Sequence, residues 1–253
     1  MKFYSPPKFL VYSFGKVGSK SIEAGIGDGC SNIHNMYFKN WACYPNYRGA
    51  EQSLFSRFKL FLFFQYRRLL LTYRKPKIVT AIRDPLDRNM SMFFHHLSAY
   101  VFSYSTGFPY GKVRANRVAA EFDSNFLVNV FEERFDHSYP VNWFDLEFKK
   151  FTGIDVYKYP FKKASPFQVI KENGFDVFIY RYEDLKTKRN EIEKGISDFC
   201  GKSIDLSEER NVAGSKWYSD LYRDFKKNYT PSEKVQAIYD SAYADFFSYP
   251  KKK

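Results

Sequence analysis

The sequence predicts an α/β fold, in which a central parallel sheet is flanked by helices and the C-terminal third is largely helical. Hydrophobic runs of strand length alternate with helical patterns over the first hundred residues, in the order β-α-β-α-β-α. The C-terminal residues carry several helix start signals in succession. The sequence has no internal repeat or Pro/Gly-rich linker, and 44% of its 253 residues are hydrophobic, so we expect one domain over residues 1–253.

The expected elements follow one another along the chain. In the first hundred residues they are strand 8–14, helix 19–28, a short strand near 32–38, helix 51–73, strand 77–82 and helix 86–101. In the remainder they are helix 115–134, a helix ending before Gly153, a hairpin or edge pair from 155–159 and 167–174, strand 175–185, and then helices. Ligands of such sheets bind beyond the carboxyl ends of the strands.

The composition limits the kinds of partner and the compartment that we expect for the protein. Forty Lys and Arg against 28 Asp and Glu give a formal charge of +12, so the surface should attract nucleotides, acidic glycans, nucleic acid or an anionic bilayer. Charge alone does not choose among them. Three cysteines without a CxxC pair and four histidines without metal-ligand spacing predict a reduced compartment and no metal. The N-terminus runs into the first strand without an apolar signal segment, which predicts a cytoplasmic location.

Residues 54–75, LFSRFKLFLFFQYRRLLLTYRK, form the most apolar helical segment. Arg57, Lys59, Arg67 and Arg68 interrupt it too often for a membrane span of about 20 apolar residues. Two interpretations stay open. The helix lies on an anionic membrane surface, or it is a core helix with an Arg-rich exposed edge, which we favour.

The stretch FLVYSFGKVGSKSIEAGI, residues 9–26, reads as a strand, an anion-binding loop and a helix. Its two glycines permit a tight turn, so that backbone amides can point at an oxyanion beside a helix N-terminus, and Lys16 adds a positive charge. The serines can donate hydroxyl hydrogen bonds or cap the helix. The candidate anion-binding residues are Gly15, Lys16, Val17, Gly18, Ser19, Lys20 and Ser21.

This loop departs from the nucleotide-binding pattern GxxxxGKS/T. A register anchored on Lys20 requires glycine at positions 14 and 19, where the chain has Phe14 and Ser19. With Lys16 soon after the strand, the loop is instead similar to the 5′-phosphosulfate loop of sulfotransferases.

A second segment, KIVTAIRDPLDRNMSMFFHH at residues 77–96, resembles the 3′-phosphate motif of sulfotransferases. Arg83 follows the strand, Asp84 and Pro85 are the expected cap and first residue of the next helix, and Ser91 comes eight residues after Arg83. An ordinary capped helix after an edge arginine is the simpler alternative for this segment alone.

Other segments extend the resemblance over nearly the full chain. YRYEDLK at residues 180–186 is similar to a strand-end segment of many sulfotransferases, for which we favour a structural role. GSKWYSDLY at 214–222, with Ser215 in place of Asn, resembles the NKWYS segment of a bacterial family of capsular polysaccharide synthesis proteins, as do WFDLE at 143–147 and IYDSAYADFF at 238–247. The resemblance implies a P-loop-like sulfotransferase fold.

It also implies the chemistry. The donor would be 3′-phosphoadenosine 5′-phosphosulfate (PAPS), which leaves adenosine 3′,5′-bisphosphate (PAP), and the acceptor a hydroxyl of a capsular or other surface polysaccharide or of a glycolipid. Lys16 would be catalytic, the loop would bind the 5′-phosphate, and Arg83 with Ser91 would bind the 3′-phosphate. Lys216 and Trp217 would form a flap over the nucleotide, although an aromatic residue is more often core. No metal and no nucleic acid partner are expected.

A base must take the proton of the acceptor hydroxyl. His34 is the first choice, because it ends the second strand beyond the same sheet edge as the loop, and histidine titrates near neutral pH. Glu147 and Asp145 are the reserves, followed by His95 and His96. A histidine without a role stays an alternative.

Two other classes of function stay open. An ATP-dependent kinase could use loop 13–21 as a phosphate cradle, and its activity would require magnesium. A non-enzymatic basic protein could bind nucleic acid or an anionic membrane, and its binding would weaken steeply with salt.

Overall fold

A computed structural model describes residues 6–42, 53–106, 123–162, 164–207 and 216–252. The chain divides into two compact units. The first unit comprises Met1–Trp41, Leu54–Arg83 and Asn142–Arg210, and the second Ala42–Ser53, Asp84–Val141 and Asn211–Lys253. The expectation that residues 1–253 act as one domain stays a prediction.

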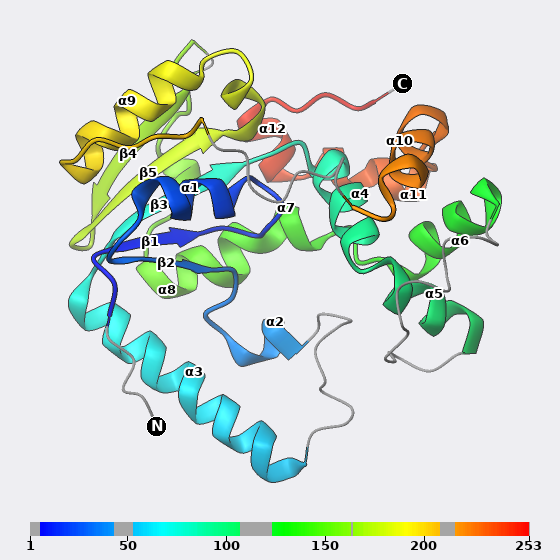
Figure 1. Cartoon of the computed structure of the whole chain (residues 1–253), viewed down its shortest axis with the longest axis horizontal. Coiled ribbons are helices and arrows are strands. Elements are labelled where there is room, and N and C mark those ends of the chain that lie inside the picture. The colour runs from blue at the N-terminus through cyan, green and yellow to red at the C-terminus, as the bar shows by residue number, and fades with distance from the viewer. Residues whose placement is uncertain (1–5, 43–52, 107–122, 163, 208–215, 253) are drawn as a thin grey trace. The chain divides into compact units, whose positions relative to one another are not determined.

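A five-stranded sheet forms the centre of the first unit, in the order β2-β1-β3-β5-β4 (Figure 1). Its strands are β1 (Phe9–Tyr12), β2 (Cys30–Ile33), β3 (Lys77–Ile82), β4 (Phe167–Glu172) and β5 (Phe175–Arg181). All but β4 run parallel. β4 pairs antiparallel with β5 through a two-residue turn, Asn173 and Gly174, whose positive φ angles of 52° and 75° are those of a tight hairpin.

The strand order places a topological switch between β1 and β3. From β1 the chain moves outward to β2 and then returns to β3 on the other side of β1. At such a point the connections after the two central strands diverge and leave a crevice beyond their carboxyl ends. Residues 13–18 follow β1 and Arg83 follows β3, so both candidate anion-binding segments lie at this edge.

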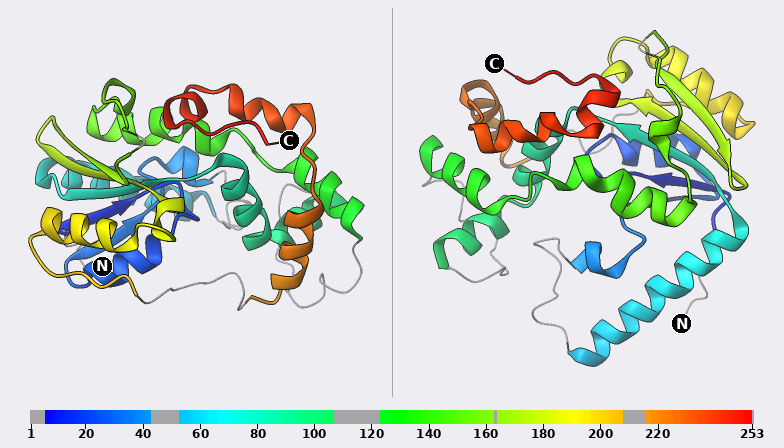
Figure 2. Two further views of the ribbon diagram at one scale, coloured as in Figure 1. Left: turned by 90° about the horizontal axis from the view of Figure 1, so that it is seen from above. Right: turned by 180° about the vertical axis from the view of Figure 1, so that it is seen from behind.

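Helices cover both faces of the sheet. α1 (Ser19–Ile26) and α9 (Arg189–Cys200) lie on one face, and the π-helical segment Phe144–Lys149 with α8 (Lys150–Thr152) lies on the other (Figure 2). On this second face the Tyr12 ring packs against Trp143 and Phe151, with centroids 4.8 and 5.7 Å apart. The unit is completed by α2 (Phe38–Ala42) and α3 (Leu54–Arg74).

The second unit is helical in its described residues. Its helices are α4 (Pro85–His95), α5 (Leu97–Thr106), α6 (Ser124–Arg134), α10 (Ser219–Asn228), α11 (Glu233–Gln236) and α12 (Ala242–Phe247), and α7 (Tyr139–Trp143) spans the boundary between the units. Aromatic side chains form its core, with Phe93 against Phe131 at 5.0 Å and Phe225 against Phe131 at 5.6 Å between ring centroids. The α/β class and the helical C-terminal third are therefore confirmed.

The predicted cap of α4 is also present. Asp84 accepts a hydrogen bond from the Asp87 amide at 2.8 Å, and Pro85 is the first helical residue. The same carboxylate receives the Tyr239 hydroxyl at 3.1 Å and pairs with Lys252 at 3.2 Å. These bonds hold the last described residue of the chain against the start of α4.

Several element boundaries differ from the prediction. β2 begins and ends earlier than 32–38, because its register pairs Cys30 with Phe9 and Ile33 with Tyr12. Helix 86–101 is two helices that meet at His96. The strand expected at 155–159 is wrong: the Asp155 carboxylate accepts from the Tyr157 amide at 3.2 Å and starts a 3₁₀ turn there. β5 ends at Arg181, and residues 115–122 lie outside the described part of the chain.

Candidate active site

The loop after β1 is a tight turn. Gly15, Lys16 and Gly18 have positive φ angles of 77°, 63° and 73°. Glycine adopts this left-handed region readily, whereas a lysine is strained in it. α1 begins directly after Gly18, which has no side chain to cap the first amides of the helix. The predicted strand, loop and helix are therefore present in the first unit.

Arg83 reaches this loop from the neighbouring strand. It follows the carboxyl end of β3, and its guanidinium donates a hydrogen bond to the carbonyl oxygen of Lys16 at 2.5 Å. A guanidinium has five N–H donors in a planar fork that matches phosphate geometry. Residues 67 positions apart in the sequence thus meet at one edge of the sheet.

Tyr182 supports both Arg83 and the loop. The Arg83 guanidinium lies 4.5 Å from the centroid of the Tyr182 ring, in a cation–π arrangement. A Cβ at Gly18 would stand 3.1 Å from the same ring, so a side chain there would crowd it. Beside it, the Tyr180 hydroxyl donates to the Val17 carbonyl at 3.2 Å. β5 and the 3₁₀ turn that follows it therefore fix the loop and the arginine together.

Ser19, Lys20 and Ser21 differ in their burial and in the groups that they contact. Ser19 is buried, and its hydroxyl oxygen accepts from the Asn32 amide at 3.1 Å. Lys20 points into an exposed ion pair with Glu23 at 2.8 Å. Ser21 is half-buried, and its amide bonds the Gly18 carbonyl at 3.0 Å in the first turn of α1.

Two buried polar atoms beside the loop are unsatisfied. Ser13 Oγ and Asn32 Oδ1 have no hydrogen-bond partner among the residues that the structure describes. Ser13 is the first residue after β1, and Asn32 lies on β2 beside it. Buried polar atoms are nearly always paired, with protein or with ordered water, so both atoms are expected to bond a group other than the described residues.

His34 lies next to this loop, directly after β2. Its Nδ1 is 2.9 Å from the carbonyl oxygen of Ser13, and its own carbonyl accepts from the Trp143 indole at 3.1 Å. Because a carbonyl oxygen can only accept, Nδ1 carries the proton in this bond. The neutral ring then has its lone pair on Nε2, the form that a general base requires.

Glu147 sits in the core of the same unit. It has no exposed surface, and its carboxylate accepts from the Tyr12 hydroxyl at 2.6 Å, the Met36 amide at 2.6 Å and the Asn40 side chain at 2.7 Å. Burial raises the pKa of this carboxyl, and the three donors oppose that rise. Glu147 thus ties the segment after His34 to β1, whereas Asp145 is exposed.

The other candidates lie in the second unit. Ser91 is half-buried on α4, and His95 and His96 follow at the end of that helix with ring centroids 4.7 Å apart. Lys216 is half-buried and Trp217 is 43% exposed, both just before α10. Gly214 and Ser215 lie outside the described residues. The roles of these residues toward a nucleotide stay predictions.

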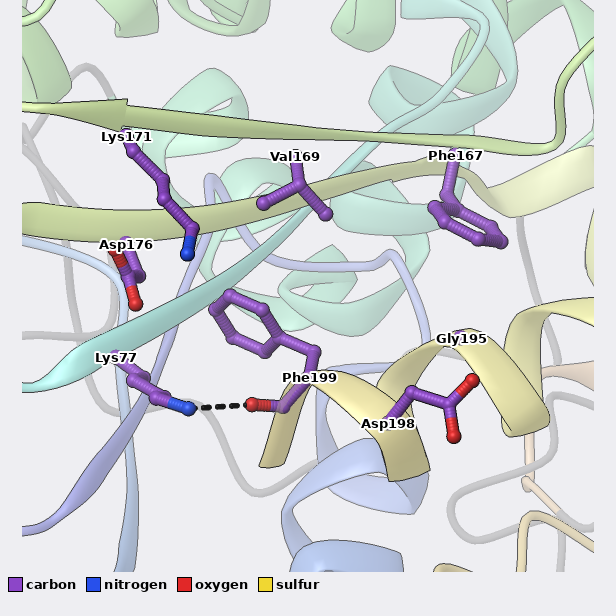
Figure 3. A pocket seen from close by; sticks show the side chains of 8 residues that line it. All are labelled: Lys77, Phe167, Val169, Lys171, Asp176, Gly195, Asp198 and Phe199. Atoms are coloured by element: carbon purple, nitrogen blue, oxygen red, sulfur yellow. Dashed lines mark hydrogen bonds between the residues drawn. The ribbon is translucent and has the colours of Figure 1, made fainter. Parts of the chain in front are cut away.

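One pocket of about 310 Å³ lies on the α9 face of the sheet (Figure 3). Figure 3 shows Lys77, whose amine donates to the Phe199 carbonyl at 2.7 Å, with Lys171 and Asp176 nearby. None of the loop residues, Arg83 or His34 lines it. In the described residues no group of three or more His, Cys, Asp and Glu side chains could hold a metal.

Sequence reasoning missed the supporting residues. The sequence predicts only a structural role for the segment that holds Tyr180 and Tyr182, and Asn32 is not among the candidates. The available signal was positional: Tyr180 lies near the end of β5, Tyr182 comes directly after that strand, and Asn32 lies within β2 as the chain approaches the same sheet edge. That β5 is the neighbour of β3 follows only from the strand order.

A family model described as a sulfotransferase domain matches residues 55–248. This range exceeds half of the chain, so the protein belongs to the sulfotransferase domain family. The match includes Arg83, Ser91 and Tyr182 and begins after the loop of residues 13–21. The fold of this protein has a central and mostly parallel sheet between helices, which is consistent with the P-loop-like fold of sulfotransferases.

A sulfotransferase crystal structure from Alicyclobacillus acidocaldarius is similar to this chain. The two sequences are 10% identical, the alignment covers 96% of this chain and 99% of that chain, and the TM-score is 0.33. No curated protein matches the chain.

Proposed function

We propose that the protein transfers the sulfuryl group of PAPS to a hydroxyl of a carbohydrate acceptor. The observation that carries this proposal is the contact between Arg83 and the Lys16 carbonyl, which joins a phosphate-type loop to a strand-end arginine at the switch point of the sheet. Membership of the sulfotransferase family supports this reaction over the kinase alternative.

The residues at the edge of the sheet fit such a donor. The loop amides and Lys16 would hold the 5′-phosphosulfate, and the unsatisfied Ser13 hydroxyl would donate to one of its oxygens. Arg83, with Ser91 of the next helix, would hold the 3′-phosphate that ATP lacks. Lys216 and Trp217 would cover the nucleotide, with charge on phosphate and indole on adenine.

Sulfuryl transfer leaves the protein mainly positioning and electrostatic stabilisation to supply, as phosphoryl transfer does. When PAPS is bound, it supplies a sulfuryl group whose departure leaves negative charge on the bridging oxygen. Lys16 would stabilise that charge. His34, with its lone pair on Nε2, would take the acceptor proton, while Ser13 holds the other ring nitrogen.

The class of acceptor, the location of the protein and its independence of metal belong to the same proposal. The segment with Lys216 and Trp217 is similar to that of capsular polysaccharide synthesis proteins, which supports a polysaccharide or glycolipid acceptor. We propose in addition a cytoplasmic location and a reaction that requires no metal. Activity that persists in a chelator would separate it from a kinase, for which magnesium bridges the phosphates.

A thermal-shift comparison of PAP with AMP tests the donor assignment. We expect PAP to raise the melting temperature clearly more than AMP, because only PAP offers a 3′-phosphate to Arg83 and Ser91. Arg83→Ala should remove this difference and lower the unliganded stability by about 2 kcal/mol, the net value of one hydrogen bond and one cation–π contact. Equal shifts for the two nucleotides with the wild-type protein would contradict the assignment.

Substitutions of Tyr182 test how Arg83 is held. Tyr182→Phe keeps the ring beneath the guanidinium 4.5 Å away, whereas Tyr182→Leu removes it. A partly desolvated cation–π contact contributes about 1 kcal/mol, so Tyr182→Leu should weaken PAP binding about fivefold. AMP binding should change less, and Tyr182→Phe should behave as the wild type. Calorimetric affinities for both nucleotides make the measurement, and equal losses in the two variants would show that the hydroxyl, not the ring, matters.

A further inference from the structure

α3 carries an exposed apolar stripe. Its members are spaced three or four residues apart, which places them on one side of the helix. They are Phe55 (66% exposed), Phe58 (57%), Leu62 (48%), Tyr66 (46%), Leu69 (73%) and Tyr73 (81%). Single exposed apolar residues are ordinary, but a contiguous row of six marks an interaction surface.

The opposite side of α3 already has its partners. Phe64 and Leu71 are the buried residues of the helix, and the Phe64 ring packs against Phe38 at 5.9 Å between centroids. Arg67 donates to the Asn35 carbonyl, and Arg68 lies 4.7 Å from the Tyr37 ring. The helix is therefore anchored by one face, and its attachment does not use the exposed stripe. The interpretation of α3 as a core helix explains its buried side but not the apolar residues on its exposed side.

The charge of α3 indicates what the stripe meets. Its 21 residues include five arginines and lysines and no acidic residue. Lys59 and Arg74 are exposed beside the stripe, and the Lys59 amine lies 4.2 Å from the centroid of the Phe55 ring. Arg57 is exposed on the side of the helix that carries Phe64. A second copy of the chain would place like charges against these, which disfavours self-association. A negatively charged surface into which aromatic rings can insert would match both the basic side chains and the apolar stripe of α3.

We infer that α3 lies on an anionic lipid bilayer, with the stripe inserted at the level of the headgroups and the exposed basic side chains on acidic lipid phosphates. Amphipathic helices rich in basic and aromatic residues bind membranes in this way. The inference does not rest on the proposed sulfotransferase reaction. It gives the enzyme a position at the membrane surface, where a lipid-linked acceptor would be within reach. In the described chain, no helix is long and apolar enough to cross a membrane.

Co-sedimentation of the full chain with vesicles tests the inference. We expect binding to vesicles of equimolar phosphatidylcholine and phosphatidylglycerol, and little binding to phosphatidylcholine alone. The variant Phe55→Gln/Phe58→Gln/Leu62→Gln should lower the partition coefficient about 100-fold or more, because three large apolar side chains no longer insert. Lys59→Gln/Arg74→Gln should lower it about 25-fold, at about fivefold for each charge near the surface.

Controls keep the result interpretable. Val169→Gln alters an exposed apolar residue on β4 and should leave partitioning unchanged. Circular dichroism and melting curves of each variant show whether it is folded, and the charge variant serves if the triple variant is not. Binding that is absent, that ignores both sets of substitutions or that is equal on neutral vesicles overturns the inference. A wild-type dimer that the stripe substitutions dissociate would overturn it as well.

Discussion

Replacing Lys16 by Ala is expected to lower turnover about 100- to 1000-fold, the usual cost of removing one group that stabilises developing charge. PAP affinity should fall far less, because PAP lacks the sulfuryl group and the bridging oxygen whose charge the amine would meet. Initial rates under saturating donor, together with calorimetric PAP affinities, measure the two effects separately.

Matched variants separate the charge of Lys16 from its backbone. With φ at 63°, Lys16 is in the left-handed region, where alanine is strained as lysine is and glycine is not. Lys16→Gly should therefore be at least as stable as Lys16→Ala and equally impaired in turnover, while Lys16→Arg should retain part of the rate. Lys20→Ala is the control in the first turn of α1, since its side-chain amine pairs with Glu23 and the substitution keeps its backbone amide. Near-normal turnover in Lys16→Ala would show that Lys16 has no catalytic role.

The fold was predictable where local signals coincide with buried strands. The strand before Arg83 was predicted with the observed bounds, 77–82, because its residues are apolar and its end is marked by Asp84 and Pro85. Residues 155–159 misled the prediction, because their β-branched and aromatic side chains favoured a strand while Asp155 supplied a local bond to the backbone instead. The pattern of apolar residues in a sequence gives no information about a side-chain hydrogen bond of this kind.

The arrangement of the candidate site was predictable where its residues stand in a short loop. Gly15, Lys16 and Gly18 mark a turn after the first strand, and Arg83 marks the end of the strand beside it. The ring of Tyr182 beneath Arg83, and the Ser13 carbonyl on His34, depend on which strands are neighbours, and no local pattern states that. Glu147 shows the reverse problem: a carboxylate was a reasonable reserve base, yet folding buries it under three donors.

His34 is the proposed base, so its removal should strongly lower turnover. His34→Ala is expected to lower turnover about 100- to 10,000-fold, the range that general acid–base catalysis contributes, while the PAP thermal shift stays intact. The wild-type rate should rise through about pH 6 to 7, where an imidazole base loses its proton, and the residual activity of the variant should lack this rise.

Two further substitutions decide whether this loss is chemical or structural. His34→Asn can still donate to the Ser13 carbonyl, as Nδ1 does over 2.9 Å, but has no basic nitrogen, so it should be as inactive as His34→Ala and more stable. Glu147→Gln places an amide group among three donors and should lower the unfolding free energy by about 1–3 kcal/mol. Because Glu147 has no exposed surface, the folded fraction of that variant should keep the wild-type pH profile. If His34→Asn retained most of the rate, or if Glu147→Gln removed the rise near neutral pH, the base would be the carboxylate and His34 a residue that only supports the loop.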